Sequence, residues 1–306
     1  MGFARTLADR QVARVHVYDV AAGESTLVHV DAEVLLEAPN WTAGGELILN
    51  GDGVLWRMPA DGSQAPKPIE LKELPELNND HVLARDGDTI YASANDGHIY
   101  AASLSTGSVR RVTTDGMPHW HFLHGVSPDG EHLAYVALNP EEGWDSGTIH
   151  IVHTDGTWDA ALTEGRGPDD GSEYAPDGEW IYLNTERFSH TPGHAQIARI
   201  RPDGTDLQQL TWDERVNWFP HIDPTGRIAV YLSFPPGTQG HPADRAVQLR
   251  LVDAAPDPLA WARSTIIVEL AGGQGTINVN SWSPDGTRLA YVDYPIGASA
   301  LDQGQE

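Results

Sequence analysis

Short stretches in which apolar positions recur with the period of a β-strand are repeated along this chain, and each is broken by a tight turn. In the clearest one, residues 172–184, Pro-Asp-Gly at 176–178 separates two short runs. Proline fixes φ near a turn value, aspartate bonds the backbone two residues on, and glycine tolerates positive φ, so this pattern predicts a β-hairpin. Residues 180–183 are apolar on both faces, which predicts a strand sandwiched between two layers.

The same unit occurs six times. Pro-Asp-Gly stands at 128–130, 176–178 and 284–286, Pro-Thr-Gly at 224–226, and degenerate copies at 42–45 and 84–87. We call the residue just before each four-residue turn motif the reference residue of its repeat: Trp41, Leu83, Val126, Tyr174, Ile222 and Trp282. Their spacings of 42, 43, 48, 48 and 60 residues, with several strands in each repeat, are typical of propeller blades.

The two ends of the chain complete one another. The last repeat stops after its first hairpin, whereas the chain begins with a lone hairpin at 15–30. We therefore predict an all-β, six-bladed β-propeller in which the N-terminal hairpin closes the last blade, because closure removes exposed sheet edges. The chain 1–306 is expected to be one domain, with blades at about 32–75, 76–115, 116–165, 166–213, 214–272, and 273–296 plus 11–31.

Composition limits the function. A formal charge of −25 argues against nucleic-acid and anionic-membrane partners, which need clustered basic residues. The chain has no cysteine, so a thiol nucleophile and a disulfide scaffold are excluded. The first ten residues lack the apolar core of a secretory signal, and no run approaches membrane-spanning length. A cytoplasmic protein is expected.

One end of the predicted ring is rich in histidine. In four-stranded blades the short turns lie at one end, so the long loops 139–146, 184–193 and 233–245 fall at the other. Loops on a rigid scaffold are where binding and catalysis are usually placed. Eight of the fourteen histidines are assigned there: His81, His119, His121, His124, His190, His194, His221 and His241.

Four residues of the kinds that ligate metals stand just before the turn motifs, on the predicted innermost strands: His81, His124, Glu173 and His221. Imidazole and carboxylate together suit Mn, Fe, Zn or Ni. The two residues nearer the N-terminus precede their reference residue by two positions and the other two by one, and neighbours on an ideal strand face opposite ways. A common site would therefore need a bulge. The alternative is that these side chains make hydrogen bonds between blades.

The repeats resemble those of the TolB-like propellers, whose "PD40" repeats are related to the WD40 class. The resemblance covers nearly the whole chain and rests on the Pro-Asp-Gly copies and on Asn217-Trp218-Phe219-Pro220-His221, Gly240-His241-Pro242 and Gly272-Gly273-Gln274-Gly275-Thr276-Ile277-Asn278. It indicates a cytoplasmic branch, since TolB itself has a signal peptide and a further N-terminal domain that have no counterpart here. The same propeller type occurs in oligogalacturonate lyases, which hold manganese with histidines at the channel mouth.

The lyase resemblance implies a divalent metal cofactor, Mn²⁺ first, with Zn²⁺, Fe²⁺, Ni²⁺ or Ca²⁺ as alternatives. In β-elimination on an acidic saccharide the metal would stabilise the enolate while a histidine takes the proton. The candidate catalytic residues are His241, His190, His194 and Arg187, and the candidate substrate-binding residues are Trp218, Asn217, Asp170, Arg245 and Asn280. Arg187 or Arg245 would pair with the substrate carboxylate.

Two classes of function stay open. One is a propeller that binds a small ligand, a saccharide in the first place, at the histidine-rich mouth and acts as a metal-dependent lyase. The other is a non-catalytic scaffold that binds a protein partner. Clustered histidines favour the first, because protein-binding faces are more often rich in exposed aromatic residues and arginine.

Overall fold

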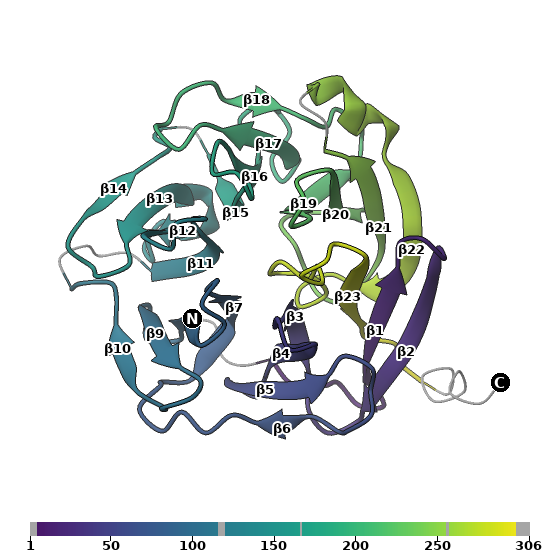
Figure 1. Ribbon diagram of the computed structural model, residues 1–306. Helices are drawn as coiled ribbons and strands as arrows, with labels where there is room; N and C mark the ends of the chain where they lie inside the picture. Colours follow the sequence, from purple (N-terminus) through teal and green to yellow (C-terminus); the bar gives the residue numbers. More distant parts are fainter. Residues whose placement is uncertain (1–4, 116–119, 166, 255–256, 298–306) are drawn as a thin grey trace.

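The computed structural model is a ring of six blades around a central channel, which confirms the predicted all-β propeller (Figure 1). It describes residues 5–115, 120–165, 167–254 and 257–297. The first two blades contain β3 (Glu37–Trp41), β4 (Glu46–Gly51), β5 (Val54–Pro59) and β6 (Lys67–Pro68), then β7 (Leu77–Leu83), β8 (Thr89–Ala94), β9 (Ile99–Ser103) and β10 (Val109–Arg111).

Blades three to five are also four-stranded antiparallel sheets. They contain β11 (Trp120–Val126), β12 (His132–Leu138), β13 (Thr148–His153) and β14 (Asp159–Ala161); β15 (Asp169–Tyr174), β16 (Ile181–Thr185), β17 (Gln196–Ile200) and β18 (Gln208–Gln209); and β19 (Val216–Ile222), β20 (Ile228–Phe234), β21 (Arg245–Asp253) and β22 (Thr265–Gly272). Two short 3-10 helices, η1 (Gly143–Ser146) and η2 (Pro258–Arg263), interrupt the loops. In the described part of the chain, neither helix has the length and apolar character needed to span a membrane.

The sixth blade joins the two ends of the chain, as predicted. Its sheet runs β2 (Glu24–Asp31), β1 (Ala13–Asp19), β23 (Arg288–Asp293), so the N-terminal hairpin supplies the outer strands (Figure 1). Arg14 stands opposite Asp293 in the register and binds its carboxylate through Nε at 2.9 Å and Nη2 at 2.5 Å. The ring is therefore closed by backbone pairing and by an ion pair.

The core lies between the blades. On β16, Ile181 and Leu183 pack toward the third blade, against Ala134 and Val136, while Tyr182 packs toward the fifth blade. This is the sandwiched strand that the two apolar faces of 180–183 predict. Burying each such aliphatic side chain contributes about 1.5–3 kcal/mol, so the packing between blades is the main stabilising term.

A bulge interrupts the innermost strand of each of the first five blades. The pairing register shifts between Glu37 and Asn40 on β3, and at the corresponding places on β7, β11, β15 and β19. In three of these strands the residue at the bulge has a left-handed backbone: Ala38, Gly171 and Phe219, with φ of 52°, 63° and 52°. A bulge re-aims the side chains on either side of it, which decides what reaches the channel.

Candidate functional site

The loop-rich end of the channel is hollow. An inner cavity of about 150 Å³ and an outer cavity of about 670 Å³ share five lining residues, so we treat them as one channel mouth. The outer cavity extends under the loops after β16 and β20, which is the end of the ring where the sequence placed its long loops. The shared residues are Arg5, Trp144, Asp170, His241 and Gln274.

Every blade sends one side chain to this mouth from the same repeat position, four residues before its reference residue. The bulge directly follows this position on β3, β15 and β19, begins one residue later on β11, and contains the position on β7. A bulge re-aims the side chains beside it. All six side chains line the inner or the outer cavity. We call them the mouth ring: Glu37, Asn79, Phe122, Asp170, Trp218 and Asn278.

Two histidines flank the Asp170 carboxylate. His124 Nε2 lies 2.9 Å from Oδ1, and His241 Nε2 lies 3.8 Å from Oδ2. Burial disfavours the imidazolium of His124, but the nearby carboxylates of Asp80 and Asp170 outweigh it and raise its pKa to about 9. For His241 burial prevails and lowers the pKa. The mouth thus holds one protonated and one neutral imidazole at neutral pH.

The same two histidines affect the carboxylate between them. Burial alone would raise the pKa of Asp170, but its hydrogen bond with His124 and the charge of that ring lower it. Asp170 therefore stays ionised at neutral pH.

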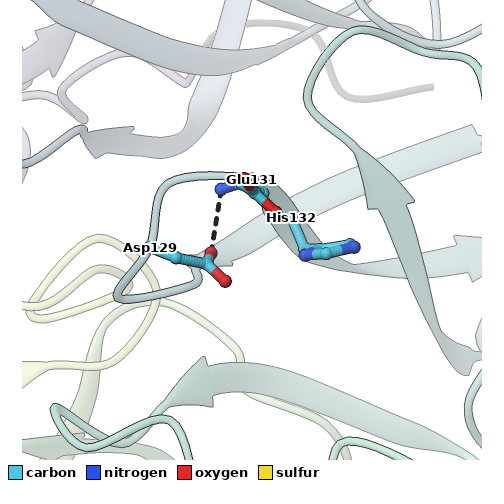
Figure 2. Close-up of side chains that lie close together, drawn as sticks. All are labelled: Asp129, Glu131 and His132. Carbon is cyan, nitrogen blue, oxygen red and sulfur yellow. Dashed lines mark hydrogen bonds between the residues drawn. The ribbon is translucent and has the colours of Figure 1, made fainter.

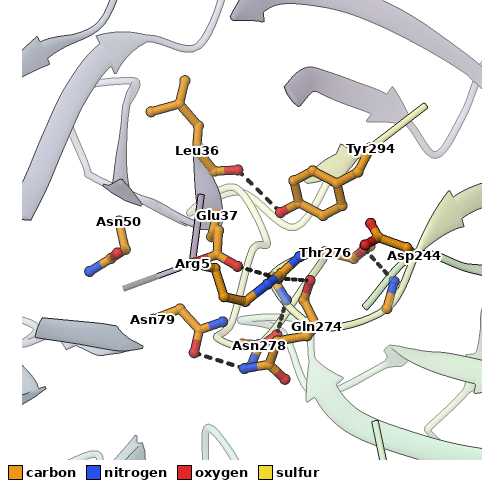
Figure 3. Close-up of polar contacts among 12 residues, drawn as sticks. Arg5, Leu36, Glu37, Asn50, Asn79, Asp244, Gln274, Thr276, Asn278 and Tyr294 are labelled. Carbon is orange, nitrogen blue, oxygen red and sulfur yellow. Dashed lines mark hydrogen bonds and ion pairs between the residues drawn. The ribbon is translucent and has the colours of Figure 1, made fainter. Parts of the chain in front are cut away.

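Two further carboxyl groups are buried in the inner cavity. Desolvation raises the pKa of Glu37 to about 7 although Arg5 opposes the shift, and raises that of Asp80 to about 6 although His124 opposes it. Arg5 Nη1 donates to Glu37 Oε1 at 2.5 Å and to the carbonyl of Gln274 at 2.7 Å (Figure 3). Asp80 Oδ1 has no hydrogen-bond partner.

Gln274 reaches across the mouth from the glycine-rich segment before the sixth blade. Its side chain bonds His241 and donates to Asn79 Oδ1 at 3.0 Å. The flanking Gly273 and Gly275 have φ of 118° and 90°, and a Cβ on Gly275 would lie 2.4 Å from Glu37 Oε1. Only glycine fits there, so these glycines hold Gln274 in the site.

Glu173 and His221 meet between blades rather than in the mouth. His221 Nδ1 lies 2.5 Å from Glu173 Oε2, and its Nε2 lies 2.6 Å from the Ile277 carbonyl. Glu173 Oε1 accepts from the Ile222 backbone at 3.1 Å and from Asn280 at 2.7 Å. We call Glu173, His221 and Asn280 the inter-blade set, because each bonds a neighbouring blade.

His81 is fully buried between the first two blades. Its Nε2 lies 3.4 Å from the Ile48 carbonyl, its Nδ1 has no partner, and burial lowers its pKa to about 4. It is therefore a neutral imidazole packed against β4, apart from the His124–Asp170 pair.

The four predicted metal ligands do not form one coordination group. Among the described residues, the one cluster of three or more His, Asp or Glu with ligand atoms within 4.8 Å of one another is Asp129, Glu131 and His132. It lies on the turn between β11 and β12, at the short-turn end of the ring (Figure 2). Both ring nitrogens of His221 already face oxygen atoms, so a metal there would have to displace existing contacts.

The other predicted site residues are held elsewhere. Arg187 binds Asp169 through Nε at 2.8 Å and Nη2 at 2.6 Å, so it is not available to a substrate carboxylate. His190 and Arg245 are exposed and line neither cavity. His194 bonds Ser189 and the Asp213 carbonyl, and Asn217 is fully buried with Asp213 and Ser233 as partners. His119 lies outside the described residues.

Several mouth residues have no role in the sequence-based prediction. Arg5 precedes the repeats, Glu37 stands in a degenerate copy, and Trp144 lies on η1. Two features of the sequence point to such residues. Glu37 stands four residues before its reference residue, as the other mouth-ring residues do, and Gln274 is flanked by two glycines. Trp218, His124, Asp170 and His241 were named from sequence, and the structure brings them together.

Comparison with known proteins gives close relatives of unestablished function and distant ones that share the fold. No protein-family profile matches the chain. An uncharacterised protein of Agrobacterium fabrum is 33% identical over 285 residues, 92% of each chain. A solved structure from Agrobacterium tumefaciens, named after TolB, has a TM-score of 0.83 at 32% identity and covers 94% of this chain and 99% of that one. An oligogalacturonate lyase in complex with manganese has a TM-score of 0.57 at 14% identity, over 88% of this chain and 75% of that one.

Proposed function

This chain belongs to the TolB-like β-propeller family, and from that premise we propose that its channel mouth binds a small polyhydroxylated ligand of the saccharide class. The observation that carries the proposal is the outer cavity, in which aromatic rings face carboxylate and amide groups. Its volume of about 670 Å³ is within the range usual for small-ligand sites.

The aromatic side is built around His241. Its ring centre lies 4.4 Å from that of Trp218 and 5.9 Å from that of Trp144. Trp144 is 51% exposed at the rim, a position from which an indole can cover the apolar face of a sugar ring. The facing polar side includes Asp170 and Gln274, whose oxygens accept hydrogen bonds from hydroxyl groups.

The charges of the mouth favour a neutral or cationic saccharide over a uronate. Asp145, Asp169, Asp170 and Glu186 line the outer cavity, and Arg187 is already neutralised by Asp169. A metal-dependent elimination would need a coordination group and a free arginine. The predicted metal ligands lie apart and Arg187 is already paired with Asp169. Metal-dependent elimination therefore has less support than saccharide binding.

Isothermal titration of a panel of neutral, amino and acidic oligosaccharides tests the proposal. We expect a neutral or amino sugar to bind, and Trp144→Leu to weaken binding about fivefold, since stacked aromatic contacts contribute on the order of 1 kcal/mol. The matched control is Trp212→Leu, a tryptophan equally exposed at 50% that lines neither cavity. Equal affinities for both variants would contradict the proposal, as would binding of no saccharide by the wild type.

A further inference from the structure

A cation from outside the repeats occupies the inner cavity. The Arg5 guanidinium is 2.5 Å from Glu37 Oε1 and 2.7 Å from the Gln274 carbonyl, and its Cζ lies 5.5 Å from the ring centre of Tyr294 (Figure 3). A carboxylate, a carbonyl and an aromatic ring are the groups by which proteins recognise organic cations. Arg5 itself belongs to no strand, so it can withdraw without breaking a sheet.

The cavity retains unsatisfied polar atoms even with Arg5 in place. Asp80 is 5% exposed and its Oδ1 has no partner, and the Asn79 side-chain nitrogen is also unpartnered. Both residues line the inner cavity. An unpartnered buried carboxylate oxygen costs free energy, so Asp80 Oδ1 is suited to a ligand that donates hydrogen bonds.

The charges in the inner cavity also favour a cationic ligand. Glu37, Asp80 and Asp170 contribute three buried carboxyl groups, and Arg5 and His124 contribute two cations. If the Arg5 side chain left, one imidazolium would remain beside three carboxyl groups. A bound cation would then restore the balance that Arg5 now provides.

We propose that the inner cavity is a subsite for an organic cation, a guanidinium or a primary ammonium group, which Arg5 fills as a tethered stand-in. The inference rests on the proposed function, because it makes the ligand of the mouth a saccharide that carries such a group. The sugar ring would lie in the outer cavity against Trp144 and Trp218, and the cationic group would displace Arg5 from Glu37.

The test uses methylguanidine as the probe and N-methylurea as its uncharged counterpart of similar shape. We expect the full-length Arg5→Ala variant to bind methylguanidine about tenfold or more tightly than the wild type, because a tethered competitor acts at an effective concentration in the millimolar range. Arg5→Lys should resemble the wild type. Glu37→Gln on the Arg5→Ala background should abolish binding, and thermal melts show whether each variant is folded.

Three results would overturn the subsite: equal binding of methylguanidine by the wild type and Arg5→Ala, equal binding of N-methylurea, or no binding by any variant. Neutral saccharides titrated into the same proteins separate this inference from the proposed function. If a neutral sugar binds and methylguanidine does not, only the subsite fails. If methylguanidine binds as expected and no saccharide does, the subsite stands and the saccharide class is wrong.

Discussion

The channel mouth and the inter-blade set draw on the same repeats, but the mouth keeps polar side-chain atoms without partners and the inter-blade set does not. In the inter-blade set each residue bonds a neighbouring blade, as in the Glu173–His221 pair. At the mouth, Asp80 and Asn79 on β7 have side-chain atoms without hydrogen-bond partners, and both residues line the inner cavity. On β15 and β19 a bulge lies between the mouth residue, Asp170 or Trp218, and the inter-blade residue, Glu173 or His221. In these two strands the bulge therefore directs the two side chains to different places.

The largest effect is expected from removing a member of the inter-blade set. Glu173→Ala leaves His221 buried, at 2% exposed, without its carboxylate partner. Breaking a buried pair in this way costs about 3–5 kcal/mol of the free energy of unfolding, measurable by urea denaturation. As a control, Glu179→Ala removes an exposed ion pair with Arg201 and should cost less than about 1 kcal/mol. Similar losses for both variants would show that the inter-blade set does not stabilise the ring.

The free energy of unfolding should depend on pH because of His124 in the channel mouth. The folded-state pKa of His124 is about 9, raised from 6.5. Its stabilising contribution is therefore complete below pH 6.5 and is lost as pH rises through about 9. The neighbouring groups are Asp80, Asp170 and His241.

By linkage, the loss amounts to at most about 3 kcal/mol. Denaturation of the wild type and of His124→Asn at pH 6.5 and pH 9 measures it. The variant should lose clearly less stability over this interval, and equal losses would contradict the raised pKa.

The contrast between the two sets also explains what the sequence could and could not show. Turn motifs and their spacing predict the six blades and the closing hairpin because both depend on local turn chemistry and on a regular period. The direction in which a side chain points depends on the bulge beside it. The bulge at Phe219 has no glycine or other turn residue that would reveal it in the sequence. Glu173 was therefore expected in the channel, while Glu37, which lies in it, was not.

A smaller loss of stability is expected from removing an uncharged side chain that forms hydrogen bonds between blades. Asn40 Oδ1 accepts from the Leu83 backbone at 2.9 Å, and its amide donates to the Asn280 carbonyl at 2.8 Å. Asn40→Ala should cost about 1–3 kcal/mol, because it leaves buried backbone groups unpaired. Thermal and urea denaturation measure the loss. A change below about 0.5 kcal/mol would mean that water replaces the side chain.

The smallest change in stability should accompany a rim substitution. Trp144 is half exposed and packs on Phe122 with ring centres 5.0 Å apart. Trp144→Leu should alter the free energy of unfolding by less than about 0.5 kcal/mol, even though it weakens ligand binding. A variant that loses stability and affinity together would place Trp144 among the structural residues instead.

The pairing of β1 with β23 sets the order in which the ring can be completed during synthesis. Arg14 and its partner Asp293 lie 279 residues apart in the chain. The hairpin of β1 and β2 therefore leaves the ribosome with an unpaired edge and keeps it until β23 has been translated. Unpaired edges are prone to association with other chains, so the nascent chain is exposed to such association until β1 pairs with β23.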